Sequence, residues 1–240
     1  RDLPIATVTN GDYLGRHLDV LARCTWVRVS LSSLREARPW LLRRPQTRRR
    51  VAETLADLGA LCRTSGLPDR EIGVGFTISD TNADEVYDLC STVAALGVQN
   101  VRLTLTWTDD AATKTAYPVL LARAQEQIDR ARADIGAGFS IYGPDAWAAY
   151  QLDQPKRYQR CGYALFVANL TADGEVWPCC VMRHVKGWSM GNIHQRPLDE
   201  ILLGEDRARF VRAINVQRCL PCIWDGRNEA MEPIVFGTDP

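Results

Sequence analysis

Cysteine is the residue type whose spacing in this sequence most directly suggests chemistry. Five of the eight cysteines lie close together in the last third of the chain, at Cys161, Cys179, Cys180, Cys219 and Cys222. Cys219 and Cys222 are two residues apart, so a tight turn lets both bind one metal centre. A β-hairpin with an Asp-Gly turn at Gly174 would bring Cys161 and Cys179 into reach of that pair. Four thiolates fit either a zinc ion or a 4Fe–4S cube, and the spacing leaves both open.

The adjacent pair Cys179 and Cys180 has to be resolved, because neighbouring side chains on a strand point to opposite faces. Cys179 follows the turn glycine by four residues, which brings the return strand level with Cys161. We therefore expect the sulfurs of Cys161, Cys179, Cys219 and Cys222 to converge, to within about 4 Å of one another around zinc and slightly more around a cube. Cys180 should turn away and pack as a small apolar residue.

The remaining thiols, Cys24, Cys62 and Cys90, lie inside or beside apolar periodic segments. We expect them to be small buried apolar residues. The chain shows no secretory signal and is too long to need stapling, which argues against a disulfide framework.

The first part of the chain alternates strand and helix patterns. Predicted strands cover Ile5–Val8, Trp26–Leu31, Glu71–Ile78 and Val101–Thr106. Predicted helices cover Tyr13–Arg23, Arg48–Cys62, Asp84–Leu96 and Tyr117–Ala133. Strand–helix alternation indicates an α/β fold with a parallel sheet and right-handed crossovers. We expect the four strands to be neighbours in chain order, with the helices on one face and the first strand as an open edge.

In such sheets ligands bind at the carboxyl ends of the strands. The polar candidates there are Thr9-Asn10-Gly11, Ser30–Ser33, the cap cluster Ser79–Asn82, and Trp107–Asp110. After residue 135 the sequence becomes rich in Trp, Tyr, Gly, Pro and Cys. Predicted strands at Tyr163–Leu170 and Glu175–Pro178 form the hairpin, and short helices follow at Pro197–Leu203 and Glu205–Ile214. We divide the chain into domains 1–135 and 136–240.

Taken in order, these motifs resemble those of radical S-adenosylmethionine (SAM) enzymes that carry a SPASM/twitch extension. The resemblance rests on the run Cys161-x12-Gly174-x4-Cys179 with a later Cys-x2-Cys, on Met190–Ile193 and on Pro197–Ile201. In the first half, Thr9-Asn10-Gly11 is similar to the family's "TNG" after the third barrel strand. Val29–Ser32 is similar to its "v-S-L-D" on the fourth.

The sequence departs from the family pattern at three points. The Cys-x3-Cys-x2-Cys triplet that holds the SAM-cleaving cluster does not occur here, nor does the glycine-rich segment after the second strand. Both would precede Arg1, so we interpret the chain as an N-terminally truncated fragment. Residues 223–240 contain no cysteine, which indicates the twitch version with one auxiliary cluster. Position 32 is Ser where the family usually has Asp.

The resemblance implies a fold, cofactors and roles. The fold is a partial (β/α)6 TIM-like barrel lacking its first strands, followed by a small α+β twitch domain. Cys161, Cys179, Cys219 and Cys222 would ligate an auxiliary 4Fe–4S cluster that accepts or relays an electron. Thr9, Asn10 and Ser30 would bind SAM at the barrel mouth. The full-length enzyme would hold a second 4Fe–4S cluster and generate a 5′-deoxyadenosyl radical that abstracts hydrogen from substrate.

The same resemblance implies a small-molecule or peptide substrate and an external electron donor such as flavodoxin or ferredoxin, with dehydrogenation and peptide modification both open. The fragment alone should be inactive, and a cytoplasmic location is expected. The alternative hypothesis is a non-enzymatic α/β module whose four cysteines bind zinc and which docks a partner.

Composition narrows the function classes. The 240 residues are 46% apolar and 24% charged, which is typical of a globular chain. Lys+Arg and Asp+Glu are both 29, so no overall charge points to a nucleic acid or an anionic membrane. The longest uncharged stretch, Leu89–Val101, has 13 residues, fewer than the roughly 18 of a spanning helix. We therefore expect neither nucleic acid nor membrane as a partner.

Overall fold

The computed structural model describes residues 4–35, 51–64, 71–106, 111–144, 155–183, 185–219, 222 and 224–237. Its contacts divide the chain into two compact units, Arg1–Ala148 and Ala149–Pro240. We call the first the sheet unit and the second the cysteine unit, and describe each by itself.

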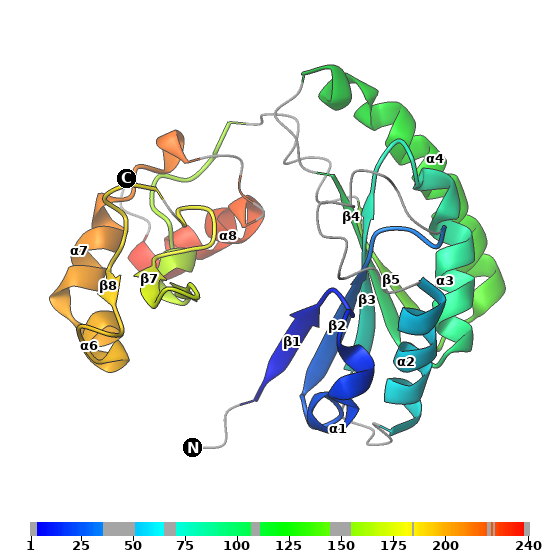
Figure 1. Cartoon of the computed structure of the whole chain (residues 1–240). Coiled ribbons are helices and arrows are strands. Elements are labelled where there is room, and N and C mark those ends of the chain that lie inside the picture. The colour runs from blue at the N-terminus through cyan, green and yellow to red at the C-terminus, as the bar shows by residue number, and fades with distance from the viewer. Residues whose placement is uncertain are drawn as a thin grey trace. The chain divides into compact units, whose positions relative to one another are not determined.

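The sheet unit is built on five parallel strands that are neighbours in chain order (Figure 1). They are β1 (Ala6–Thr9), β2 (Trp26–Leu31), β3 (Glu71–Ile78), β4 (Asn100–Leu105) and β5 (Ser140–Tyr142). The predicted parallel order of the first four is confirmed. β1 is an edge strand, as expected, and Val8 on it is 60% exposed.

One face of this sheet is covered by α2 (Val51–Thr64), α3 (Val86–Ala95) and α4 (Ala111–Ile135) (Figure 1). Alternate strand residues point to this face, and Val29, Val74 and Val101 on it have no exposed surface. They join the apolar sides of the helices in one core. The strand–helix alternation therefore forms the α/β layers that the sequence predicts.

Some predicted elements differ in the structure. The helix expected at Tyr13–Arg23 is two short pieces, the 3-10 turn η1 (Leu14–Arg16) and α1 (Leu18–Leu21). β5 was not predicted, and because it pairs with β4 the division falls between Ala148 and Ala149 and not between residues 135 and 136. The start of α3 is preceded by the 3-10 turn η4 (Ala83–Glu85).

The cysteine unit combines a small antiparallel sheet with short helices. The sheet order is β6 (Asn169–Leu170), β7 (Glu175–Trp177) and β8 (Gly191–Asn192). The helical elements are η5 (Tyr163–Leu165), α6 (Leu198–Leu203), α7 (Glu205–Ala213), η6 (Val216–Arg218) and α8 (Asp225–Phe236). The expected strand at Tyr163–Leu170 is mostly turn, and α8 was not predicted.

The predicted hairpin is present, because β6 and β7 pair antiparallel around Thr171–Gly174. Gly174 has a φ of +84°, and a Cβ there would lie 2.6 Å from Cδ2 of His194. Both the backbone and the space therefore require glycine at this turn.

No helix in the described part of the chain is long and apolar enough to cross a membrane.

Candidate metal centre and strand-end site

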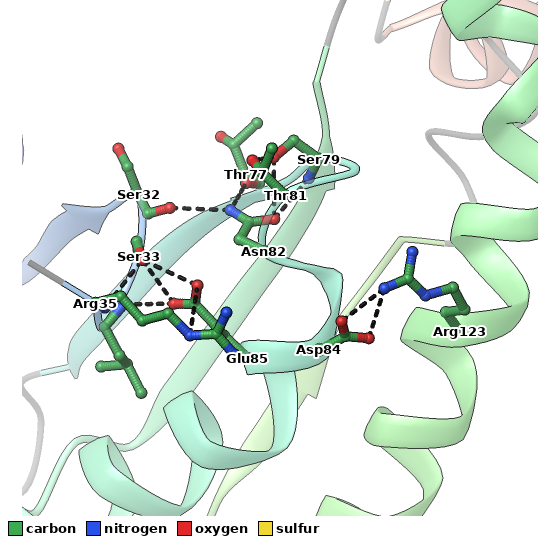
Figure 2. A network of polar contacts seen from close by, with 11 residues as sticks. Ser32, Ser33, Arg35, Thr77, Ser79, Thr81, Asn82, Asp84, Glu85 and Arg123 are labelled. Carbon is green, nitrogen blue, oxygen red and sulfur yellow. Dashed lines mark hydrogen bonds and ion pairs between the residues drawn. The ribbon is translucent and has the colours of Figure 1, made fainter. Parts of the chain in front are cut away.

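The segments that follow β2 and β3 are joined by polar side chains (Figure 2). Asn82, 3% exposed, donates through Nδ2 to the carbonyl oxygens of Ser32 at 2.9 Å and Thr77 at 2.8 Å. Its Oδ1 accepts from the backbone N–H of Ser79 at 2.7 Å. The sequence suggested a helix cap here, but Asn82 makes no side-chain capping bond to η4. Its amide instead ties together the carboxyl ends of two neighbouring strands.

Glu85 completes this network from η4. It is 2% exposed, and its carboxylate accepts from Oγ of Ser33 at 2.7 Å and from the backbone N–H of Leu34 at 2.6 Å. Nε of Arg35 lies 3.6 Å from Oε1. Sequence reasoning missed Glu85, because an acidic residue in the first turn of a predicted helix is ordinary and gives no sign of burial. The pair Asn82 and Glu85 fixes the course of the chain directly after Ser30.

The three residues expected to bind SAM are not brought to one face. Oγ1 of Thr9 accepts from the backbone N–H of Gly11 at 3.2 Å, and Asn10 bonds Asp12 through both ends of its amide. These side chains therefore stabilise their own loop. Thr9 is in register with Val29, whose side chain faces the helices, whereas the exposed Ser30 points to the opposite face. Ser30 therefore lies on the uncovered face, whereas Thr9 does not. The candidates at 107–110 lie outside the described residues.

The four cysteines expected to bind metal come from four separate places in the cysteine unit. Cys161 precedes η5, Cys179 follows β7, Cys219 ends η6 and Cys222 precedes α8. All four are half-buried free thiols, whereas Cys180 is exposed. Cys180 is thus turned away from the interior, toward solvent and not into packing.

The four thiols interact electrostatically. Burial is the main cause that raises their pKa values, to about 12 for Cys222. Charge on Cys161 and Cys179 further raises the pKa of Cys219, and charge on Cys179 further raises that of Cys222. Among the described residues, no three His, Cys, Asp or Glu side chains are arranged to hold a single metal ion.

Nearby N–H groups act on three of these thiols. The backbone of Ala164 and Tyr163 and the side chain of Asn228 lower the pKa of Cys161, against the larger effect of burial. The backbone of Met182 and Val181 lowers that of Cys179 in the same way. The N–H of Trp224 lies 3.4 Å from Sγ of Cys222. Donors of this kind stabilise thiolate charge and surround the sulfurs of iron–sulfur clusters.

A buried ion pair lies beside Cys222. Asp225 accepts from Nζ of Lys156 at 3.0 Å, from the hydroxyl of Tyr158, and from the backbone N–H of Cys222 at 3.2 Å. The side chain of Lys156 is 7% exposed. Its positive charge lowers the pKa values of Cys219 and Cys222, opposing the effect of burial. This donor set fits an iron–sulfur cluster, because it offers four thiols, N–H donors and a buried cation to a group of negative charge.

Comparison with known proteins agrees with that donor set. Residues 161–228 match the family model of SPASM, described as an iron-sulfur cluster-binding domain. No curated protein sequence matches the chain. Among solved structures, SuiB of Streptococcus suis bound to S-adenosylmethionine matches with a TM-score of 0.55 and 12% identity, over 86% of this chain and 50% of that one.

SuiB bound to its precursor peptide SuiA matches with a TM-score of 0.58 and 12% identity, over 88% of this chain and 50% of the other. A further crystal structure of SuiB matches with a TM-score of 0.54 and 10% identity, over 83% of this chain and 49% of that one. The chain thus spans about half the length of these structures. At such identities the likeness is one of fold, and it includes the α/β layers of the sheet unit.

The resemblance drawn from the cysteine pattern is thereby confirmed: residues 161–228 match the iron–sulfur cluster-binding domain SPASM, and the chain shares its fold with about half of SuiB.

Proposed function

We propose that this chain is the auxiliary-cluster half of a radical SAM enzyme that modifies a peptide, with Cys161, Cys179, Cys219 and Cys222 holding one 4Fe–4S cluster. The observation that carries the proposal is the set of four half-buried thiols within the SPASM match, together with their N–H donors. The sheet unit is the matching part of the barrel, and the cysteine unit is the cluster domain.

When bound, a cluster held by four cysteines supplies an electron acceptor or relay with no open iron site for substrate. The chain's own residues set the conditions for that role. Asn228 and the backbone N–H groups stabilise negative charge on the sulfurs, while Lys156 offsets it from beside Cys219 and Cys222. Asp225 holds Lys156 in place and accepts from the N–H of Cys222, so it fixes the turn that carries this ligand.

Ser30 is the best placed of the three residues expected to bind SAM. Its hydroxyl is exposed near the carboxyl end of β2, on the face that the helices leave uncovered. There it can donate to a ribose hydroxyl or to a carboxylate oxygen. Thr9 and Asn10 would contribute by holding the turn at Gly11, whose φ is +83°.

A peptide is the favoured substrate class, because SuiB, which shares this fold, is described in complex with a precursor peptide. We keep a small-molecule substrate as the second candidate. In either case the reaction takes electrons from an external donor such as flavodoxin or ferredoxin, which places the enzyme in a reducing compartment such as the cytoplasm.

The test replaces each of the five clustered cysteines with alanine and measures iron per chain after anaerobic reconstitution. We expect loss of iron and of visible absorption for Cys161, Cys179, Cys219 and Cys222, and full retention for Cys180→Ala as the matched control. Loss of iron in Cys180→Ala with retention in Cys179→Ala would show that Cys180, and not Cys179, is the ligand. Full iron in all five variants, or zinc bound in its place, would overturn the cluster.

A second measurement addresses SAM. The sequence contains no Cys-x3-Cys-x2-Cys triplet, and an open iron site needs a cluster held by three cysteines. The 240-residue chain should therefore produce no 5′-deoxyadenosine from SAM with dithionite. Detection of that product with this chain alone would contradict the assignment.

A further inference from the structure

Helices α2, α3 and α4 cover one face of the five-stranded sheet (Figure 1), and the opposite face carries polar residues on its central strands. Strand alternation and register place on it the residues that do not face the helices. They are Trp26, Arg28 and Ser30 from β2, Glu71, Gly73, Gly75 and Thr77 from β3, and Asn100, Arg102 and Thr104 from β4. Arg28 on β2 and Arg102 on β4 therefore lie on either side of the two glycines of β3.

The glycines of β3 make room for the arginine of β2. Arg28 is in register with Gly73, and Arg102 is in register with Gly75. A Cβ at Gly75 would lie 3.3 Å from Cδ of Arg28, so the side chain of Arg28 leans over Gly75. This direction carries its guanidinium toward the row that Arg102 occupies.

Neither guanidinium group is paired with a carboxylate of the described residues. In the part of the chain that the structure describes, neither Arg28 nor Arg102 forms an ion pair or hydrogen bond, and Nε of Arg28 is shielded from solvent without a partner. The guanidinium of Arg28 lies 5.2 Å from the ring centre of Trp26.

The other titratable groups near Arg28 only partly offset this charge. Burial and the charge of Arg102 lower the pKa of Arg28, whereas Glu71 and Tyr142 raise it. Glu71 stands one row below, and its carboxylate already accepts from Nδ2 of Asn100. Two guanidinium charges against one carboxylate leave a single excess positive charge, which complements a monoanion.

We propose that Arg28 and Arg102 bind a carboxylate group of a ligand laid over the glycines of β3. A carboxylate matches both the net charge and the planar fork of a guanidinium. In terms of the proposed function, on which this identification rests, the ligand is an acidic peptide substrate. A carboxylate also occurs in SAM, so the test has one arm for each source.

The test measures binding to the reconstituted 240-residue chain with three probes: a fluorescein-labelled peptide of six glutamates, the same peptide with six glutamines, and SAM. Arg28→Gln and Arg102→Gln remove one charge each. The matched control is Arg123→Gln, which removes an arginine of α4 that is paired with Asp84 of η4. Thermal unfolding by circular dichroism checks that all variants fold.

We expect each of the two variants to weaken binding of the glutamate peptide at least tenfold, with unchanged binding of the glutamine peptide and no loss in Arg123→Gln. A tenfold loss confined to SAM also supports the carboxylate site and assigns it to that molecule. Unchanged affinity for all probes, or an equal loss in Arg123→Gln, overturns the proposal. Iron per chain is recorded for each variant, so failure of the carboxylate site is distinguished from failure of the cluster assignment.

Discussion

The sheet unit and the cysteine unit bury their side chains in different ways. In the sheet unit one continuous core joins strands and helices, and Val29, Phe76 and Leu103 within it are at most 1% exposed. The cysteine unit has two smaller clusters, one around Tyr158 and Val211 and one around Val176 and Ile201. A core this small stabilises a domain weakly, so the cysteine unit has to draw stability from other interactions.

Polar contacts supply part of that stability. The guanidinium of Arg207 donates to the carbonyl oxygens of Leu165 at 2.7 Å and of Ala164 and Val167 at 3.2 Å. Glu232 accepts from the backbone N–H groups of Gln159 and Arg160 at 2.9 and 2.6 Å. These contacts hold the chain on both sides of Cys161. The comparison indicates that the cysteine unit is organised around its thiols, whereas the sheet unit is organised around apolar layers.

The sharpest test of this contrast removes the cluster. Cys161→Ala should abolish iron binding and, because metal-binding free energy is folding free energy in small metal domains, cost the cysteine unit several kcal/mol. Hydrogen exchange should show protection lost across α7 and α8 and retained in β2, β3 and β4. Cys180→Ala is the control and should leave both units protected. Equal protection of α7 with and without iron would show that its apolar clusters suffice.

The reverse test weakens the sheet unit alone. Phe76→Ala deletes a ring that is 1% exposed and should lower the free energy of unfolding of the sheet unit by about 3–5 kcal/mol. Iron per chain should be unchanged. Val119→Ala, at a side chain that is 66% exposed on α4, should change stability by less than about 0.5 kcal/mol. A loss of iron in Phe76→Ala would show that the two units fold as one.

The same contrast explains how far the sequence predicts the molecule. In the sheet unit, apolar residues recur at strand and helix periods because each element has one face in the core, so its first four strands and their order were predictable. β5 was missed because only its three residues from Ser140 to Tyr142 are extended. In the cysteine unit the elements are short. The helix α8 was missed because Gly226 and Pro233 interrupt its helical pattern.

The candidate sites also differ in how far the sequence predicts them. Cysteine spacing is a local signal, and it predicted that Cys180 differs from the other four clustered thiols, as its exposure shows. The contacts of Glu85 and the approach of Arg28 to Arg102 join residues from different strands, so they depend on register that a single sequence does not contain. The face on which Thr9 lies depends on the alternation of side chains along β1. Its register with Val29 places the Thr9 side chain toward the helices.

The buried carboxylate at the strand ends provides a test of intermediate size. Glu85→Ala leaves the hydroxyl of Ser33 and the N–H of Leu34 without their acceptor and should cost about 2–3 kcal/mol. Asp84→Ala removes the neighbouring exposed ion pair with Arg123 and should cost less than about 1 kcal/mol. Urea unfolding of both variants gives the comparison. Equal effects would show that the network does not fix the segment after β2.

A buried thiol in the sheet unit links stability to pH. Burial raises the pKa of Cys90 from 9.0 to about 12, so between these values the folded state holds a proton that the unfolded state has lost. Stability contributed by Cys90 is therefore complete below pH 9 and falls as pH rises, with a slope approaching about 1.4 kcal/mol per unit. Urea unfolding at pH 8 and pH 10 should show a smaller decrease for Cys90→Ala than for the unchanged chain. An identical decrease in both would exclude this thiol as a source of the pH dependence.

The smallest expected effect separates a tuning role from a packing role for Asn228. This residue is 1% exposed and accepts from the N–H of Tyr163 at 2.8 Å, and its side chain lowers the pKa of Cys161, as a donor near the sulfur does. A reduced cluster carries more negative charge than an oxidised one, so the donor stabilises the reduced form more. Asn228→Leu removes that donor and should lower the reduction potential by roughly 40 mV, the equivalent of one net hydrogen bond for one electron. Asn228→Asp keeps the acceptor for Tyr163 but adds negative charge, so it should lower the potential further. The control is Asn192→Ala on β8, where Asn192 donates to Glu175. This variant should leave the reduction potential unchanged. Redox titration followed by electron paramagnetic resonance measures all three, and an unchanged potential with full iron in both Asn228 variants would reduce this side chain to a support for the turn at Tyr163.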